Sequence, residues 1–170
     1  MNYYVINVRT GSEKKYVAST RRVLPQTEGR LIWPRRCLSI RKAGKTNERI
    51  SSLYPGYLFW ETEILTDVSR TALIKTPGFI KFLKSGNKIV PLVHREKEIF
   101  LELISYGEII QKSRVVFDEN NRIRVIDGPL LNLEGNIVKV DRRKERAKVL
   151  LSLHGKTLMV DIGFKKIETF

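Results

Sequence analysis

The side chains with the clearest capacity for chemistry are cations near the end of the chain. Residues 141–148 hold five cations and two acids between Val140 and Val149, a placement that predicts a hairpin tip. Arg and Lys bind phosphates and release the counterions that surround nucleic acid. The segment therefore predicts an RNA site; the alternative is a charged tip that only protects a sheet edge. The candidate RNA-binding residues are Arg122, Arg124, Arg142, Arg143, Lys144, Arg146, Lys148, His154 and Lys156.

Two other groups of cations lie in the first half of the chain. Lys14, Lys15, Arg21 and Arg22 share one face of a predicted helix, which favours contact with DNA phosphates, or is simply an ordinary solvated helix face. A second group lies in a polar segment in which only Glu48 opposes it: Arg35, Arg36, Arg41, Lys42, Lys45 and Arg49. This segment suits a nucleic-acid backbone or an acidic polymerase surface; the alternative is a disordered, solubilising loop.

Nothing in the sequence has the spacing of a catalytic or metal site. His94, His154 and Cys37 lie far apart, so they form no metal-ligand motif and no nucleophile–base pair. Residues 44–46 and 155–157 both read Gly-Lys-Thr, but each lacks the earlier glycine of a phosphate-binding loop. We therefore expect a protein that is not an enzyme and that needs neither a cofactor nor a metal.

The composition favours a polyanionic partner. The 170 residues include 32 Lys and Arg against 18 Asp and Glu, a formal net charge of +14, and 42% of them are hydrophobic, enough for packed cores. Apolar runs are too short to cross a membrane, and the first residues lack the pattern of a signal peptide. A single cysteine excludes an internal disulfide framework. We expect a cytoplasmic protein with no membrane partner.

The first part of the chain alternates predicted strands and helices. Apolar periodicity predicts strands over 3–8 and 79–83, helices over 13–24, 67–75 and 95–106, and a β-prone stretch over 31–40 that Pro34 interrupts. Ser12 is the expected N-cap of the first helix. Residues 41–52 predict a loop or the tip of a long hairpin.

From residue 122 onward the helical period is absent, and five short strands in about 50 residues predict a small β-barrel. We expect an α+β protein with an N-terminal α/β domain over 1–108, a linker over 109–121 and a barrel over 122–170. The net charges of residues 1–108 and 109–170 are +9 and +5, so both halves are basic.

Several motifs, in order, resemble the NusG family of transcription factors. The N-terminal motifs are Tyr3-Tyr4-Val5, the run Leu-Tyr-Pro-Gly-Tyr-Leu-Phe at 53–59, and Thr-Pro-Gly-Phe at 76–79. The run 125–130, Val-Ile-Asp-Gly-Pro-Leu, followed by Leu-Glu-Gly-Asn-Ile-Val at 133–138, resembles the KOW motif of that family. The resemblance covers essentially the whole chain and implies an NGN domain followed by an SH3-like KOW barrel.

The resemblance also implies partners. The family binds bacterial RNA polymerase, and its NGN domain docks on the clamp helices of the largest subunit. The matching residues are Tyr54, Tyr57 and Phe59, although strand alternation offers the alternative that these aromatics are core. Ser69, Arg70 and Thr71 match in part the residues that touch the polymerase gate loop in RfaH. The first helix is expected near upstream and non-template DNA.

One departure from the housekeeping members points to a specialised role. Residues 154–156 are His-Gly-Lys where the general factor has the Phe-Gly-Arg that contacts a ribosomal protein. The chain is most similar to the specialised LoaP group, and its β-branched C-terminal pattern argues against the helical switch of RfaH. We expect a monomeric elongation and antitermination factor that the KOW domain recruits to particular operons by binding nascent RNA, such as a hairpin. The alternative is a general factor whose KOW domain contacts proteins only.

Overall fold

The computed structural model describes residues 1–168, and the chain divides into two compact units. Unit 1 comprises Met1–Trp33, Tyr54–Glu98 and Leu153–Lys156; unit 2 comprises Pro34–Leu53, Ile99–Ser152 and the described residues from Thr157 onward. The expected barrel range 122–170 includes residues 169 and 170, which lie outside the described residues. The α+β class is confirmed, because helices and antiparallel sheets occur together along the chain.

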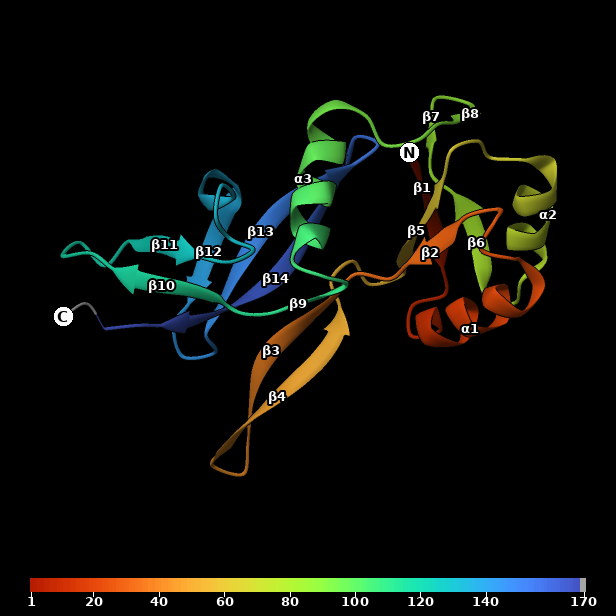
Figure 1. Cartoon of the computed structure of the whole chain (residues 1–170). Helices are drawn as coiled ribbons and strands as arrows, with labels where there is room; N and C mark the ends of the chain where they lie inside the picture. The colour runs from red at the N-terminus through yellow and green to blue at the C-terminus, as the bar shows by residue number, and fades with distance from the viewer. Residues whose placement is uncertain (169–170) are drawn as a thin grey trace. The chain divides into compact units, whose positions relative to one another are not determined.

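Unit 1 is built on a four-stranded antiparallel sheet. Its strand order is β2 (Arg30–Ile32), β5 (Tyr57–Thr62), β1 (Asn2–Val8) and β6 (Phe79–Phe82). Helices α1 (Glu13–Val23) and α2 (Asp67–Lys75) cover one face of this sheet (Figure 1). Tyr16 and Val17 of α1 and Leu73 of α2 pack there against Leu58 and Trp60 of β5. Burial of these large apolar groups is the main stabilising contribution to the unit.

Helix α1 differs in detail from its prediction. Tyr16, Val17 and Thr20 are buried as the spacing requires, but Val23 is 61% exposed and does not belong to the apolar face. The reason is that the helix ends there: Leu24 takes an extended conformation and turns its own side chain into the core. Ser12 is at the N-cap position, yet its side chain makes no capping hydrogen bond.

A Pro-Gly turn connects to the aromatic strand β5. The Tyr57 N–H donates to the Tyr54 carbonyl at 2.9 Å, and Gly56 has φ of +82° after Pro55, the geometry of a type II turn. The Gly56 N–H donates to a carboxylate oxygen of the buried Glu13 at 2.8 Å. A Cβ at Gly56 would lie 2.8 Å from the Thr10 hydroxyl oxygen, so only glycine fits this turn without displacement.

Helix α2 has the bounds that the sequence predicts. The Thr66 side chain accepts a hydrogen bond from the Ser69 N–H at 3.1 Å, which caps the first turn. Thr76 is extended, as expected of a residue that precedes proline, and the helix ends before it. The short strands β7 (Lys84–Ser85) and β8 (Lys88–Ile89) then form a small ribbon before α3 (His94–Ser105).

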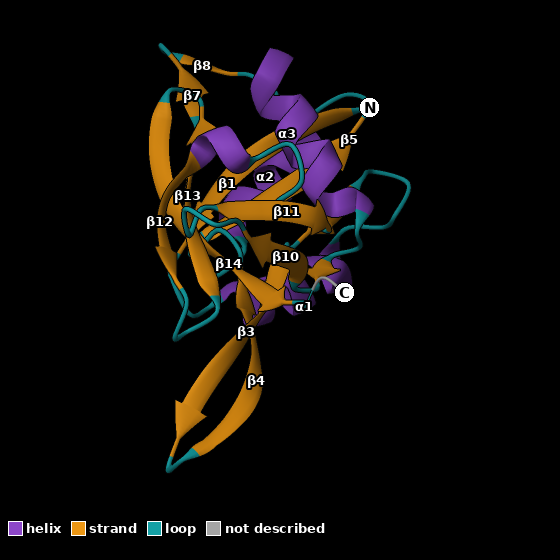
Figure 2. Ribbon diagram, turned by 90° about the vertical axis from the view of Figure 1, so that its left-hand side faces the viewer, coloured by secondary structure: helices purple, strands orange, loops and turns teal. Residues whose placement is uncertain are grey.

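Unit 2 contains a five-stranded, curled sheet, which fits the small barrel expected from the sequence (Figure 2). The strand order is β11 (Ile123–Asp127), β10 (Ser113–Phe117), β14 (Lys156–Lys166), β13 (Arg146–Leu153) and β12 (Ile137–Asp141), and a single 3₁₀ turn, Glu134–Asn136, precedes β12. Strands β10 and β14 are parallel. The buried core includes Val115, Val149, Leu151, Ile162 and Phe164.

The segment 109–121, expected to be a linker, contains β9 (Ile109–Ile110) and β10. Strand β10 lies between β11 and β14 in the curled sheet, and β14 is one continuous strand of 11 residues. The sequence did not predict β10 because Ser113 and Val115 alternate with the exposed Arg114 over too few residues for the period-two pattern to stand out among polar neighbours. Its partner β14 lies about 50 residues further on.

A long hairpin also belongs to unit 2 (Figure 2). Strands β3 (Arg35–Lys42) and β4 (Lys45–Ser52) pair over their whole length, and β9 adds to β3 in parallel. The tip is the two-residue loop Ala43-Gly44, in which both residues have positive φ, +51° and +76°, as a type I′ turn requires. Of the two interpretations of residues 41–52, the hairpin is therefore the observed one.

Candidate nucleic-acid interface

Unit 2 contains a basic cavity of about 700 Å³. It lies between two elements that are about 100 residues apart in the sequence, the hairpin β3–β4 and the turn that joins β12 to β13. We name these the hairpin wall and the turn wall. The hairpin wall consists of Ser39, Ile40, Arg41 and Thr46, and the turn wall consists of Arg142, Arg143, Lys144, Glu145 and Arg146.

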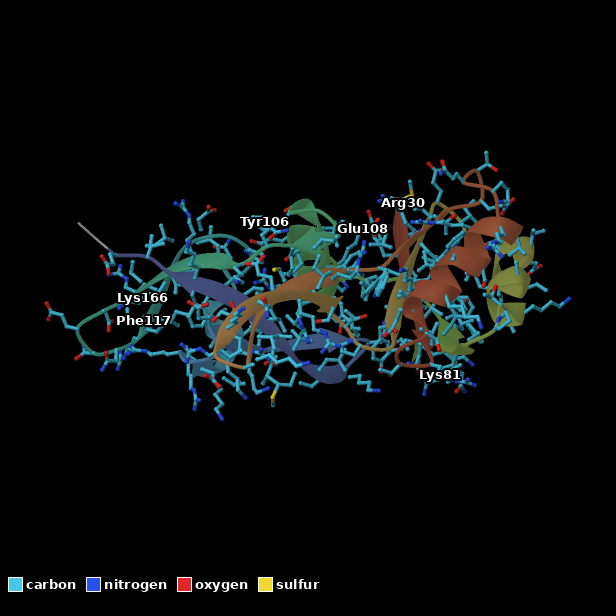
Figure 3. The ribbon with its side chains drawn as sticks, turned by 90° about the horizontal axis from the view of Figure 1, so that it is seen from below. Arg30, Lys81, Tyr106, Glu108, Phe117 and Lys166 are labelled. Atoms are coloured by element: carbon cyan, nitrogen blue, oxygen red, sulfur yellow. The ribbon has the colours of Figure 1, made fainter. Side chains whose placement is uncertain are left out.

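The turn wall is held by its own hydrogen bonds. The Lys144 N–H donates to Asp141 Oδ1 at 2.9 Å, and this bond is the main reason that the pKa of Asp141 lies below its ordinary value. Arg142 Nη2 donates to the carbonyl of Asn121 at 3.0 Å, and its guanidinium lies 3.8 Å from the ring centroid of Phe117. Figure 3 labels Phe117 on β10 and Lys166 on β14, which are neighbouring strands of the curled sheet. The guanidinium of Arg142 is therefore fixed in place at the edge of the cavity.

The cations of the cavity differ in how strongly the protein already neutralises them. Arg146 Nη1 lies 3.5 Å from Asp161 Oδ2, and Arg146 Nη2 donates to the Ser39 carbonyl. Arg41, Arg143 and Lys144 are exposed and form no salt bridge with an acid among residues 1–168. These three cations have the charge and access that phosphate contacts need.

The other predicted RNA-binding residues do not line this cavity. Lys148 Nζ donates to Asp161 Oδ1 at 3.0 Å, so its charge is already paired. Arg122, just before β11, and Arg124, within it, are exposed and lie outside the cavity lining. His154 and Lys156 belong to unit 1, where the His154 N–H donates to Glu96 and Lys156 Nζ donates to the Tyr57 hydroxyl.

The predicted DNA-binding residues are all exposed on α1. Lys14 and Lys15 lie in its first turn, and Arg21 and Arg22 lie in its last. A separation of seven residues is almost two full turns, so each first-turn lysine shares a face with a last-turn arginine, about 10 Å along the axis. The one acid at this end of the helix, Glu13, faces inward and is 4% exposed. The charged side chains exposed on α1 are therefore all basic.

The predicted polymerase-binding residues divide into two groups. Tyr54, Tyr57 and Phe59 are 2%, 6% and 0% exposed, so in this arrangement their rings are core. Burial raises the pKa of Tyr54 above its ordinary range, as expected for a phenol far from water. Ser69 is buried and occupied with the cap of α2, whereas Arg70 and Thr71 are exposed on the outer side of that helix.

The sequence did not indicate that the hairpin wall and the turn wall belong to one site. Arg41 belonged to a separate predicted cluster, and Ser39, Ile40 and Thr46 carried no functional signal.

Within residues 1–168, no group of three or more His, Cys, Asp and Glu is arranged to hold a metal. None of the helices described is long and apolar enough to span a membrane.

Comparisons with known proteins point to one family. Residues 1–101 match the family described as "Transcription termination factor nusG". The Bacillus subtilis (strain 168) protein "Transcription termination/antitermination protein NusG" is 29% identical over 176 residues, which cover 98% of this chain and 97% of that protein. The protein of the same name from Neisseria meningitidis serogroup B is 28% identical over 174 residues, covering 98% of this chain and 96% of that protein. A solved structure titled "Domain interaction in Thermotoga maritima NusG" superposes with a TM-score of 0.62 at 23% identity, covering 95% of this chain and 93% of that one, and so supports the fold.

Proposed function

Because the chain belongs to the NusG family of non-enzymatic transcription termination and antitermination factors, we propose that it is an antitermination factor that RNA recruits to particular operons. Family membership implies RNA polymerase as the partner. In this proposal the N-terminal domain holds polymerase in a processive state and the KOW domain binds nascent RNA. The LoaP group is the proposed subfamily, and the cytoplasm is the proposed location.

The observation that carries the RNA proposal is the turn wall. It presents Arg143 and Lys144 to solvent without an acidic partner, on a turn that Asp141 and Arg142 hold in shape. Because the hydrogen bonds of Asp141 and Arg142 hold the backbone of the turn, binding of phosphate costs less conformational entropy than it would on a mobile loop. A guanidinium also matches phosphate oxygens with two parallel hydrogen bonds.

The polymerase contact has two candidate surfaces in unit 1. Arg70 and Thr71 are exposed and can contact polymerase directly. Tyr54, Tyr57 and Phe59 are core here, so a role for these aromatics in docking requires their surroundings to open. The basic face of α1 (Lys14, Lys15, Arg21 and Arg22) is the proposed contact with upstream and non-template DNA. We further propose that the protein is a monomer.

The test combines binding and transcription with the full chain. Arg143→Gln with Lys144→Gln should weaken binding to a leader RNA hairpin and make the slope of log affinity against log salt shallower by about 1.4, roughly 0.7 for each phosphate contact. Lys165→Gln with Lys166→Gln is the matched control, because both residues are exposed lysines of unit 2 outside the cavity. Read-through of a terminator should require the leader RNA and should fall in the first variant only. RNA binding that is undetectable at low salt, or equally weakened in both variants, would contradict the proposal.

A general factor whose KOW domain contacts only proteins is the second candidate. The observation in its favour is that Val138 and Met159, on strands of the curled sheet, are 51% and 60% exposed. Exposed apolar side chains are a feature of protein interfaces. This candidate predicts read-through that does not depend on the leader RNA and that falls when Met159 is changed to Gln.

A further inference from the structure

We propose that the hairpin wall is the second half of the RNA site, so that an RNA phosphodiester backbone lies in the cavity between Arg41 on one side and Arg143 with Lys144 on the other. The proposal rests on the proposed function, because it assumes that the turn wall binds RNA. It adds that a segment before residue 101, inside the region that matches the family, contributes directly to RNA binding.

The two walls are joined directly by hydrogen bonds. Ser39 Oγ donates to Glu145 Oε2 at 3.1 Å, and Arg146 Nη2 donates to the Ser39 carbonyl at 3.0 Å. The Phe164 N–H donates to the Glu145 carbonyl at 2.9 Å, which ties the turn wall to β14 as well. These bonds fix the width of the cavity before any ligand binds, and preorganisation of this kind lowers the entropic cost of binding.

The base of the hairpin is anchored to the same unit at further points. A Cβ at Gly163 of β14 would lie 2.6 Å from the Cys37 carbonyl oxygen, so β3 and β14 approach as closely as their backbones allow. Lys112 Nζ pairs with Glu48 Oε1 at 2.8 Å, which connects β4 to the segment before β10. The hairpin is thus a rigid wall of the cavity and not a free arm.

The charges of the cavity favour a polyanion over a single carboxylate. Glu145 is the one acid among the lining residues, and its carboxylate already accepts from Ser39. Arg41 pairs across the hairpin with Thr46, so one wall offers a guanidinium beside a hydroxyl. Cations on both walls match an RNA backbone, which carries a negative charge at every nucleotide, and the planar guanidiniums of Arg41 and Arg143 suit the geometry of phosphate oxygens.

The test uses one residue of the hairpin wall and a matched control in the full chain. Arg41→Gln removes a lining cation. Arg49→Gln removes an exposed arginine of the same hairpin that does not line the cavity. Arg49 is the cross-strand partner of Leu38, which is three positions from Arg41, so the side chains of Arg49 and Arg41 belong to opposite faces of the hairpin. Arg41→Gln should weaken binding to the RNA hairpin about fivefold to tenfold and make the salt slope shallower by about 0.7. Arg49→Gln should change affinity less than about twofold.

A second measurement does not depend on any variant. RNA that carries 4-thiouridine is crosslinked to the wild-type chain, and the crosslinked peptides are identified by mass spectrometry. Crosslinks are expected both in 39–46 and in 142–146. Crosslinks in 142–146 alone would overturn the inference and leave the proposed function standing. The same conclusion would follow if Arg41→Gln and Arg49→Gln bound RNA with equal affinity while Arg143→Gln with Lys144→Gln still weakened binding.

Other ligands are separate arms of the same experiment. If neither the hairpin-wall variant nor the turn-wall variant weakens RNA binding, both the inference and the proposed function fail. If Arg41→Gln weakens only the binding of duplex DNA of the same sequence, or only that of polyglutamate, the cavity is not an RNA site and the inference is overturned.

Discussion

Ser39 and Glu145 are 106 residues apart in the sequence, and a hydrogen bond of 3.1 Å joins Ser39 Oγ to Glu145 Oε2. Ser39 is 6% exposed, so this bond forms where water competes poorly. It is one of the links that bring two separate basic segments to opposite sides of one cavity. The arrangement of charge in unit 2 therefore depends on a small number of polar contacts that can be tested one by one.

Removal of either partner of this bond should loosen the cavity. Ser39→Ala and Glu145→Ala should each lower the free energy of unfolding by about 0.5–1.5 kcal/mol, the usual net contribution of such a bond. Because the two residues share that interaction, the double variant should lose less than the sum of the single losses. Urea denaturation of the wild type, the two single variants and the double variant measures the coupling energy between Ser39 and Glu145. Strictly additive losses would mean that the bond contributes nothing to stability.

Lys148 should contribute little to RNA binding, although the sequence placed it among the candidates. Its ammonium pairs with Asp161, which also holds Arg146. Lys148→Gln should therefore lower stability by at most about 1 kcal/mol and should leave the salt slope of RNA binding nearly unchanged. Arg143→Gln is the comparison, since its cation has no acidic partner within residues 1–168. Equal effects of Lys148→Gln and Arg143→Gln on the salt slope would show that the ion pair with Asp161 does not keep the Lys148 ammonium from RNA phosphates.

Gly56 should be one of the least replaceable residues in unit 1. Gly56→Ala places a Cβ 2.8 Å from Thr10 Oγ1 and 3.3 Å from the Val8 carbonyl oxygen, at a φ of +82°. We expect a loss of about 1–3 kcal/mol in the free energy of unfolding. Gly135→Ala is the control, because its Cβ would meet nothing within 4 Å, and it should change stability by less than about 0.5 kcal/mol. Thermal or urea unfolding separates the two, and similar losses would refute the steric argument.

Stability should fall at alkaline pH, and part of the fall should come from Tyr16. Its hydroxyl donates to the Leu73 carbonyl at 2.7 Å, and burial raises the pKa of the phenol above its ordinary value. The folded state thus favours the neutral form, so this contribution is complete below about pH 10 and is lost as the pH rises toward the folded pKa. Tyr16→Phe should cost about 1 kcal/mol or more at pH 7. It should also flatten the decline in stability above about pH 10. An unchanged decline would assign that decline to other groups.

Much of the fold follows from local sequence. Helix α2 has the predicted bounds because Thr66 supplies its cap and Thr76 precedes a proline. The class, the α1 and α3 helices and most strands follow from apolar periodicity, which depends only on neighbours along the chain. The sequence did not predict strand β10, because its five residues, Ser113–Phe117, are too few to show a clear period and its pairing with β14 is a contact at long range.

The site divides in the same way. The sequence by itself determined that a basic turn lies within residues 141–148, because cations and flanking apolar residues are visible in order along the chain. The structure narrows the turn to 142–145, since β12 ends at Asp141 and β13 begins at Arg146. Only the tertiary structure decided that Arg41 faces this turn, that Asp161 neutralises Lys148, and that Tyr54 and Phe59 are buried. The physical reason is that these outcomes depend on which strands pair and how closely their backbones approach. Both are set by the packing of residues far apart in sequence, which no local pattern records.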